Sequence, residues 1–157
     1  MTDTPSPSVA LDDQLCFDLH VAADAVVGAY TPSLNKLGLS YEQYLVLLVL
    51  WEHGDLTLGA LAERLRTTIG RIVPTVRRMA MHGLVDRHDA AEEADMMIAP
   101  TAKAQDLRRP VTDLHCAVRD SLGMTKEEFR GLQAILRRVA AAPPVTGTTP
   151  FLSRAGA

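Results

Sequence analysis

The stretch LAERLRTTIGRIVPTVRRMAMHGLV, residues 61–85, decides the fold. Thr57 is a residue type that caps helices, and it predicts a short helix over residues 58–65. A second helix is expected after a break at residues 66–68. It ends just before Gly83, because glycine suits the left-handed position that closes a helix. Two helices joined by so short a break are typical of a helix-turn-helix.

This stretch is also the most basic part of an acidic chain. Residues 61–88 hold six arginines and two acids, a net charge of +4, whereas the whole chain of 157 residues carries −3. The remainder therefore carries −7. A basic segment in an acidic protein indicates a local anionic partner rather than general affinity for polyanions.

The elements beside this stretch complete a winged helix-turn-helix over about residues 55–100. Ser40 followed by Gln43 has the capping-box pattern and predicts a helix over residues 41–53 that stops at Gly54. Residues 84–88 and 96–99 flank an acidic, alanine-rich stretch and predict a small β-hairpin wing. We therefore expect a mainly α fold.

Long helices with apolar faces are expected on both sides of this middle part, over about residues 11–35 and 101–142. The first is predicted to end near Pro32, and the second to bend at Pro110 and to restart at a capping box on Thr125. Their apolar faces are most simply buried against a second copy, giving a symmetric homodimer. Residues 11–142 then form one domain, between a disordered arm (1–10) and a disordered tail (143–157).

Composition excludes several classes of protein. The chain is 47% hydrophobic and 22% charged, as in ordinary globular proteins. No apolar run approaches the roughly 20 residues of a membrane-spanning helix, and the start of the chain does not resemble a signal peptide. Two cysteines make no disulfide scaffold, so a reducing, cytoplasmic location is expected. The five histidines show no ligand spacing, so neither a metal nor a cofactor is expected.

The predicted recognition helix has residues suited to double-stranded DNA. Its first half holds small and basic residues that can approach base edges, whereas arginines further along are placed for phosphates. The wing offers only two basic side chains at its base, since residues 89–95 hold four acids and no base. The candidate DNA contacts are Thr67, Thr68, Gly70, Arg71, Thr75, Arg77, Arg78, Arg87 and His88. A solvated basic helix face is the plainer alternative.

Cys16 and Cys116 are the only thiols. Cys16 lies beside the apolar stripe of the first helix, and His20 follows one turn later. A protonated His20 would lower the pKa of the Cys16 thiol, while nearby aspartates would oppose that effect. Lone cysteines in helices are more often inert small hydrophobes, and local sequence does not decide the matter.

Several segments resemble the organic-hydroperoxide-sensing repressors of the MarR family. The resemblance covers about residues 11–142, and its most specific part is the Cys16 motif with tyrosines 14 and 25 residues later. The matching segments are QLCF (14–17), AY (29–30), LGLSYEQYLV (37–46), LVLWE (48–52), LAERL (61–65) and GLV (83–85), with Gly70, Pro74 and Arg78.

The resemblance implies roles that no periodicity shows. It makes Cys16 the peroxide-reactive thiol and places Tyr30 and Tyr41 of the other subunit as hydrogen-bond donors to its sulfur. Such donors favour the thiolate, which is the nucleophile toward peroxide. Some family members carry a second cysteine that resolves the oxidised thiol as an intersubunit disulfide. Cys116 falls at about that place, and a small cellular thiol is the other candidate resolver.

Two departures from the family pattern concern DNA. Family wings usually carry an Asp-Glu-Arg run whose arginine enters the minor groove, but here the run is Glu92-Glu93-Ala94. The turn over residues 67–71 also differs from the acidic and small residues frequent in the family. The operator is therefore expected to differ from the usual one.

These observations favour a dimeric repressor, not an enzyme, which leaves a pseudo-palindromic operator when an organic hydroperoxide oxidises Cys16. A second hypothesis is a MarR-type regulator that responds to a small aromatic or lipophilic ligand in a dimer-interface pocket. A third, a thiol peroxidase, lacks support because the chain has no CxxC motif and no thioredoxin-like pattern. A MarR-type fold that has lost DNA binding is a fourth, which the acidic wing permits.

Overall fold

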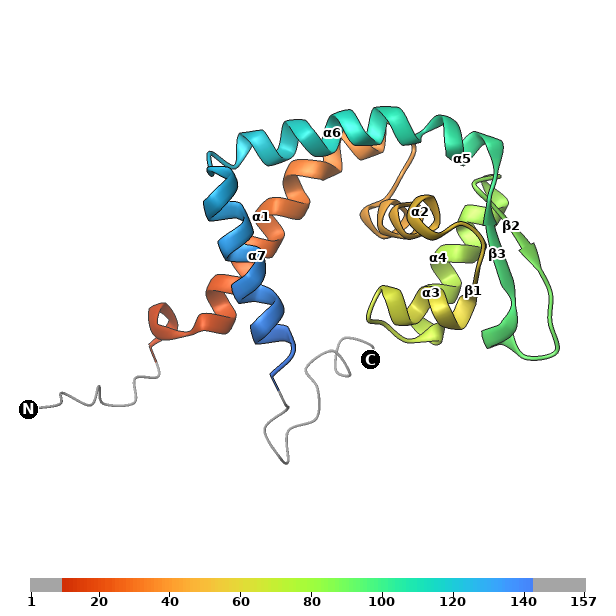
Figure 1. Cartoon of the computed structure of the whole chain (residues 1–157), viewed down its shortest axis with the longest axis horizontal. Helices are drawn as coiled ribbons and strands as arrows, with labels where there is room; N and C mark the ends of the chain where they lie inside the picture. Colours follow the sequence, from red (N-terminus) through yellow and green to blue (C-terminus); the bar gives the residue numbers. More distant parts are fainter. Residues whose placement is uncertain (1–9, 143–157) are drawn as a thin grey trace, which may run out of the picture. The chain divides into compact units, whose positions relative to one another are not determined.

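A computed structural model describes residues 10–142 (Figure 1). They form two compact units, the first ending at Val118 and the second beginning at Arg119. The helices are α1 (Leu15–Lys36), α2 (Tyr41–His53), α3 (Leu58–Arg64), α4 (Ile69–Met81), α5 (Ala102–Asp106), α6 (Arg108–Ser121) and α7 (Lys126–Ala140), with 3₁₀ turns η1 (Leu11–Asp13) and η2 (Glu93–Asp95). The strands are β1 (Leu56–Thr57), β2 (Val85–His88) and β3 (Met97–Pro100). Apart from Ala10, the predicted arm and tail lie outside the described residues.

The core of the first unit is built around α2. Its sequence, YLVLLVLWEH over residues 44–53, is apolar almost all round, as expected of a helix enclosed by other elements. Its side chains Val46, Leu47 and Leu50 are at most 1% exposed, and α2 contacts α1, α3, α4 and β3. The middle of the chain is thus a mainly helical winged helix-turn-helix, which confirms the predicted fold class.

The predicted caps of α2 are confirmed. The Gln43 backbone N–H donates to the Ser40 hydroxyl at 3.3 Å, and the Ser40 N–H donates to the Gln43 side-chain oxygen at 3.0 Å. These bonds satisfy two donors that the first turn of a helix leaves unpaired. Gly54 ends the helix with a φ of +74°.

The wing is an antiparallel sheet in the order β1-β3-β2. The predicted hairpin is confirmed, with Val85 opposite Pro100 and His88 opposite Met97. The third strand, β1, was not predicted, because two residues are too few to show a strand period. Between β2 and β3, η2 packs on α3 so closely that a Cβ on Gly59 would lie 3.2 Å from the Ala94 carbonyl oxygen.

The prediction that the first helix ends near Pro32 is wrong, since α1 continues to Lys36. Proline removes one N–H from the helix, but the following turn places Leu34 in the core with no exposed surface. The helix instead ends after the Leu39 N–H donates to the Leu34 carbonyl at 2.9 Å, with Gly38 at a φ of +71°. Burial of Leu34 and this closing turn outweigh the cost of the proline.

The predicted bend at Pro110 falls three residues earlier in the chain. The chain breaks at Leu107, between α5 and α6. Pro110 lies in the first turn of α6, where a backbone N–H has no helical partner to lose. Upstream, Thr101 caps α5 by accepting from the Ala104 N–H at 3.3 Å and also donates to the Gly83 carbonyl at 2.7 Å.

In the second unit, α7 begins at the predicted capping box. The Thr125 N–H donates to the Glu128 carboxylate at 2.8 Å, and the Glu128 N–H donates to the Thr125 hydroxyl at 3.2 Å. The hydrogen bond from the Thr125 backbone, followed by that from its side chain, lowers the pKa of Glu128. Capping chemistry therefore sets where this helix starts.

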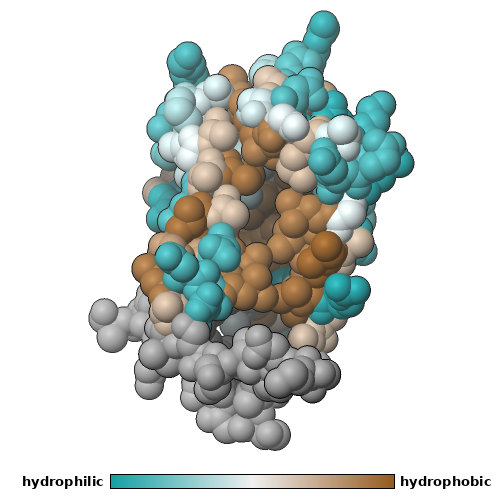
Figure 2. Space-filling model, turned by 90° about the vertical axis from the view of Figure 1, so that its left-hand side faces the viewer, coloured by the Kyte–Doolittle hydropathy of each residue, from teal (hydrophilic) through white to brown (hydrophobic). Residues whose placement is uncertain are grey.

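Both units expose large apolar side chains. Most of those in the first unit lie in η1 and on α1, and those in the second unit form one stripe of α7. They are Leu11, Leu15, Phe17, Val21, Leu48 and Met81 in the first unit, and Leu132, Ile135, Leu136 and Val139 in the second. Figure 2 shows one face of the molecule on which hydrophobic side chains gather.

Gly70 in α4 and Gly83 just after it predict opposite effects of the same substitution. Gly83 closes the helix at a φ of +68°, so Gly83→Ala is expected to lower the free energy of unfolding by about 1 kcal/mol. Gly70 lies in the first turn at an ordinary φ with open space around it, so Gly70→Ala is expected to raise it by about 0.5 kcal/mol. Urea unfolding of both variants at one protein concentration tests this. Shifts of the same sign would contradict the role of the left-handed turn.

Candidate functional site

A three-residue turn sets the angle between α3 and α4. Arg66 is the one non-glycine residue of the described chain with a positive φ, +52°. The Thr67 N–H donates to the Ala62 carbonyl at 3.0 Å, which is the bond that usually closes a helix onto glycine. Thr68 then caps α4 by its backbone alone, since its side chain makes no cap bond. The predicted break is confirmed.

The helix α4 has one buried and one basic face. Ile72, Thr75, Val76 and Met79 are buried against the rest of the first unit. The exposed residues include five of the predicted DNA contacts, namely Thr68, Gly70, Arg71, Arg77 and Arg78. Thr67 is half-buried. Thr75 is only 6% exposed, and its hydroxyl accepts from the Arg78 guanidinium at 3.4 Å, so its contact with a base stays a prediction.

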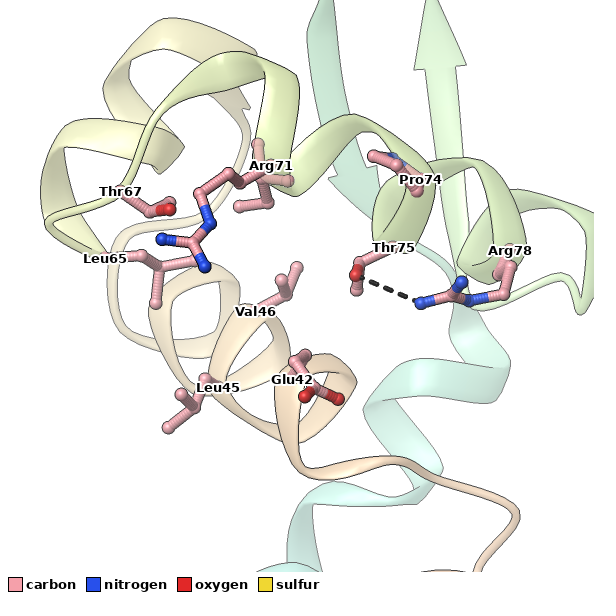
Figure 3. A pocket seen from close by; sticks show the side chains of 10 residues that line it. Glu42, Leu45, Val46, Leu65, Thr67, Arg71, Pro74, Thr75 and Arg78 are labelled. Atoms are coloured by element: carbon pink, nitrogen blue, oxygen red, sulfur yellow. Dashed lines mark hydrogen bonds between the residues drawn. The ribbon is translucent and has the colours of Figure 1, made fainter. Parts of the chain in front are cut away.

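A pocket of about 420 Å³ opens between α2 and α4 (Figure 3). Its walls combine apolar side chains with one carboxylate and two guanidinium groups, and in Figure 3 Arg71 and Arg78 flank it. The lining residues are Glu42, Leu45, Val46, Leu65, Thr67, Arg71, Ile72, Pro74, Thr75 and Arg78. Sequence reasoning missed this pocket, because its two walls are about 30 residues apart along the chain.

Arg87, the arginine of the wing, contacts other residues of the wing. The Arg87 Nε donates to the Met96 sulfur at 3.3 Å, and its guanidinium lies 3.9 Å from the Asp89 carboxylate. On α4, Arg77 lies 4.0 Å from the carboxylate of Glu93 in η2. Both pairs are at least partly exposed, so they contribute little stability and can exchange for other anions. His88 is exposed at the end of β2.

Cys16 is exposed in the first turn of α1. The imidazole of His20, predicted to support this thiol, lies 3.5 Å from the Asp24 carboxylate, and both side chains are more than 70% exposed. Its effect on Cys16 stays a prediction.

All three tyrosines of the chain form one cluster with His115. Tyr30 is buried and stacks on Tyr44 with ring centroids 5.3 Å apart, and Tyr41 lies 6.1 Å from Tyr30. The Tyr30 hydroxyl and Nδ1 of His115 share a hydrogen bond of 2.9 Å. Sequence reasoning missed Tyr44 and His115. The spacing of Tyr41 and Tyr44 on one helix was the available signal for Tyr44.

Burial governs the acidity of two of these phenols. Desolvation, and then the nearby Tyr30, raises the pKa of Tyr41. Desolvation also raises the pKa of Tyr44, and the nearby Tyr30 adds to this shift. Both phenols therefore stay protonated well above neutral pH and are available as hydrogen-bond donors.

The tyrosine cluster lies far from the thiol of its own chain. Cys16 and Tyr30 are fourteen residues apart on the uninterrupted helix α1, and a rise of 1.5 Å per residue separates them by about 21 Å. Cys116 is half-buried on α6, next to His115 in the sequence. Neighbouring helix residues do not face each other, so Cys116 and His115 point in different directions.

Comparison with known proteins identifies the family. The model of the MarR family matches residues 39–92. The organic hydroperoxide resistance transcriptional regulator of Bacillus subtilis is 33% identical over 126 residues, which cover 80% of this chain and 84% of that protein. The chain belongs to the MarR family. It is thus a member of a family of transcriptional regulators rather than enzymes.

Solved structures of other MarR-type regulators share the fold. Reduced AbfR of Staphylococcus epidermidis bound to DNA is 26% identical, with a TM-score of 0.66 over 84% of this chain and 96% of that one. CouR from Rhodococcus jostii RHA1 bound to p-coumaroyl-CoA is 25% identical, with a TM-score of 0.71 over 88% of this chain and 99% of that one.

Two kinds of feature are absent from the described residues of this MarR-family chain. Among residues 10–142, no three His, Cys, Asp or Glu side chains lie close enough together to hold a metal ion. Within the same residues, no helix is both long and apolar enough to cross a membrane.

The tyrosine cluster predicts a late alkaline titration. Because burial raises the pKa of Tyr41 and Tyr44 above the ordinary 10.0, their contribution to stability is complete below that pH and is lost as pH rises through the raised values. Phenolate absorbance at 295 nm is expected to lag behind that of urea-unfolded protein, and Tyr44→Phe is expected to remove the latest step. Coincident titrations of folded and unfolded protein would contradict the burial.

Proposed function

We propose that this MarR-family protein binds operator DNA as a homodimer and releases it when an organic hydroperoxide oxidises Cys16. The observation that carries the proposal is the separation of an exposed Cys16 from the buried Tyr30 at the other end of α1. Donors that cannot reach the thiol within one chain can reach it only from a second chain. The 33% identity to an organic hydroperoxide resistance regulator supports the same arrangement.

DNA binding is supported by the exposed arginines of α4. A recognition helix enters the major groove with its N-terminal residues toward the bases, and in α4 those residues include Thr68, Gly70 and Arg71. A symmetric dimer would present two such helices to half-sites about 34–36 Å apart, which predicts a pseudo-palindromic operator. Reduced AbfR, of similar fold, is bound to DNA.

Dimerisation is supported by the apolar side chains that each unit exposes. Leu15 is 62% exposed and Val21 49% exposed on α1, and Ile135 is 49% exposed on α7. Apolar stripes of this length on a single chain are typical of faces buried in an oligomer. A two-fold interface buries the same faces of both copies.

The proposed reaction balances with a hydroperoxide as the oxidant. The Cys16 thiolate attacks the terminal peroxide oxygen, so an S–O bond forms while the O–O bond breaks. Sulfur loses two electrons to the peroxide, and the leaving alkoxide takes a proton to become an alcohol. The resulting sulfenic acid then condenses with a thiol, from Cys116 of the second copy or a small molecule, and releases water.

Oxidation would act on DNA through the position of α1. A sulfenic acid is larger than a thiolate and changes the hydrogen bonds that Tyr30 and Tyr41 make to the sulfur. A rigid-body shift of a few ångström between subunits is enough to move two recognition helices off successive major grooves.

The pocket between α2 and α4 favours a second candidate function. Its apolar walls and its two arginines suit a ligand with a hydrophobic body and an anionic group. Because Arg71 and Arg78 are also candidate DNA contacts, such a ligand would compete with DNA directly. CouR, of similar fold, is bound to an aromatic acyl-CoA.

The DNA-binding assignment predicts that arginines of α4 matter more than the wing. Arg71→Ala and Arg77→Ala are each expected to cost about 1–3 kcal/mol of binding if the arginine reads a base, or to reduce the salt slope by about one if it contacts a phosphate. Fluorescence anisotropy of an operator fragment across a salt series measures both. The wing variants Glu92→Ala and Glu93→Ala are the controls, and a larger loss from either would show that the assignment is wrong.

The sensing assignment predicts that Cys16→Ser binds DNA as the wild type does and ignores peroxide. Stoichiometric cumene hydroperoxide should release the wild-type protein from its operator in an anisotropy assay, because only the wild type carries the reactive sulfur. Cys116→Ser is the matched control, and it should still release DNA at first but over-oxidise or fail to recover.

Two other results would point elsewhere. If cumene hydroperoxide releases Cys16→Ser from its operator at the wild-type rate, Cys16 is not the sensor. Release of Cys16→Ser by an aromatic carboxylate, in the absence of peroxide, would favour the pocket between α2 and α4 as the sensing site.

A further inference from the structure

We propose that His115 is a positioning residue of the peroxide sensor: its hydrogen bond with Tyr30 decides whether the Tyr30 hydroxyl is offered to the Cys16 sulfur of a second copy. This inference rests on the proposed function and adds a residue to it that lies outside the motifs of the sequence. It concerns the first unit alone, since α1, α2 and residue 115 of α6 all precede Arg119.

The geometry holds the two groups in one relative position. Nδ1 of His115 lies 2.9 Å from the Tyr30 hydroxyl oxygen, and the rings stack with centroids 6.4 Å apart and planes at 26°. Tyr30 is only 7% exposed, so water competes little for this hydrogen bond. The contact joins residues 85 positions apart in the chain.

The valence of the Tyr30 hydroxyl makes the direction of this bond important. A phenol has one proton to donate and two lone pairs that accept. The ring of Tyr44 stacks on Tyr30 with centroids 5.3 Å apart and covers one side of the phenol. The bond with His115 uses either a lone pair of the Tyr30 oxygen or its single proton.

The two directions have opposite consequences for sulfur. If Nδ1 of His115 is unprotonated, Tyr30 donates its only hydroxyl proton to the imidazole. It then has no proton to donate to a thiolate. If Nδ1 carries hydrogen, His115 donates to Tyr30, and the Tyr30 O–H is free to point outward. A thiolate can only accept, so its approach selects the chain His115 N–H to Tyr30 O–H to Cys16 S⁻.

This chain would stabilise the reactive form of Cys16. Each donor in series polarises the next, so the phenol that faces the thiolate is a stronger donor when His115 donates to it. Tyr41 is half-buried beside Tyr30 and supplies the other donor implied for the sulfur. Removing the His115 donor is therefore expected to lower the thiolate fraction of Cys16 without removing either phenol.

Two variants separate the hydrogen bond from the ring. His115→Phe keeps an aromatic ring against Tyr30 but has no Nδ1, whereas His115→Asn loses the ring but keeps an amide near the place of Nδ1. The full-length reduced protein is mixed with cumene hydroperoxide, and the rate constant of Cys16 oxidation is measured. The pH midpoint of Cys16 alkylation by iodoacetamide is a second readout, which loss of packing alone would not move.

We expect His115→Phe to slow oxidation by about three- to tenfold, the effect of one hydrogen bond, and to raise the alkylation midpoint. His115→Asn should stay within about twofold of the wild type. Tyr30→Phe should also slow oxidation, and adding His115→Phe to it should cause no further loss, because both act through one hydroxyl. Unchanged DNA affinity of the reduced variants shows that they fold. If His115→Phe does not fold, His115→Leu takes its place.

The role of His115 and the cysteine sensor can be tested separately. Wild-type oxidation rates in both His115→Phe and His115→Leu, with slow oxidation in Tyr30→Phe, would overturn the role of His115 and leave the cysteine sensor standing. A wild-type Cys16 that reacts no faster than free cysteine would overturn the proposed function, and the role of His115 with it.

Discussion

The length of one uninterrupted helix constrains the whole account of this protein. Helix α1 carries Cys16 in its first turn and Tyr30 fourteen residues later, so the thiol and the buried phenol lie about 21 Å apart in one chain. The helix does not end at Pro32, because Leu34 in the following turn is fully buried. One end of α1 is therefore fixed in the core, while the other exposes Cys16 among apolar side chains. A second copy is therefore needed to bring Cys16 to the Tyr30 hydroxyl, as the proposed sensor requires.

Carboxylates of the acidic wing compete with DNA phosphates for arginines of α4 and β2. Arg77 lies beside Glu93, and Arg87 beside Asp89, so each of these arginines has a carboxylate within 4.0 Å in the absence of DNA. DNA phosphates would have to replace these carboxylates, which is possible because exposed pairs are weak. Ala94, which stands where family wings have arginine, is held against Gly59 by the packing of η2 on α3. We therefore expect affinity for DNA to depend mainly on α4 and its preceding turn.

Local signals made much of the fold predictable from the sequence. Ser40 with Gln43, Thr57, Gly83 and Thr125 act on the backbone within a few residues, so the starts of α2, α3 and α7 and the end of α4 followed directly. The helix end predicted at Pro32 was wrong and the bend predicted at Pro110 falls three residues earlier, because the effect of a proline depends on packing elsewhere. Pro32 is tolerated because of Leu34, and Pro110 because the chain breaks three residues earlier, at Leu107. Strand β1 was missed because its partner β3 lies 40 residues away.

The candidate site was predictable only in its parts. The motif around Cys16, Tyr30 and Tyr41 is local, but the contacts that give it chemistry join α1 and α2 to residue 115 of α6. No spacing along the chain predicts the hydrogen bond between Tyr30 and His115. The same is true of the pocket whose walls come from α2 and α4. Function here depends on tertiary contacts between elements that are each ordinary by themselves.

The central claim, that Cys16 of one chain meets Tyr30 of the other, is tested most directly with mixed dimers. In one dimer, a Tyr30→Phe chain with intact Cys16 is paired with a Cys16→Ser chain that keeps Tyr30. In the other, a wild-type chain is paired with a chain carrying both Cys16→Ser and Tyr30→Phe. Each dimer has one Cys16, and its rate of oxidation by cumene hydroperoxide is measured. The account predicts the wild-type rate in the first dimer and a slower rate in the second, and the reverse order would contradict it.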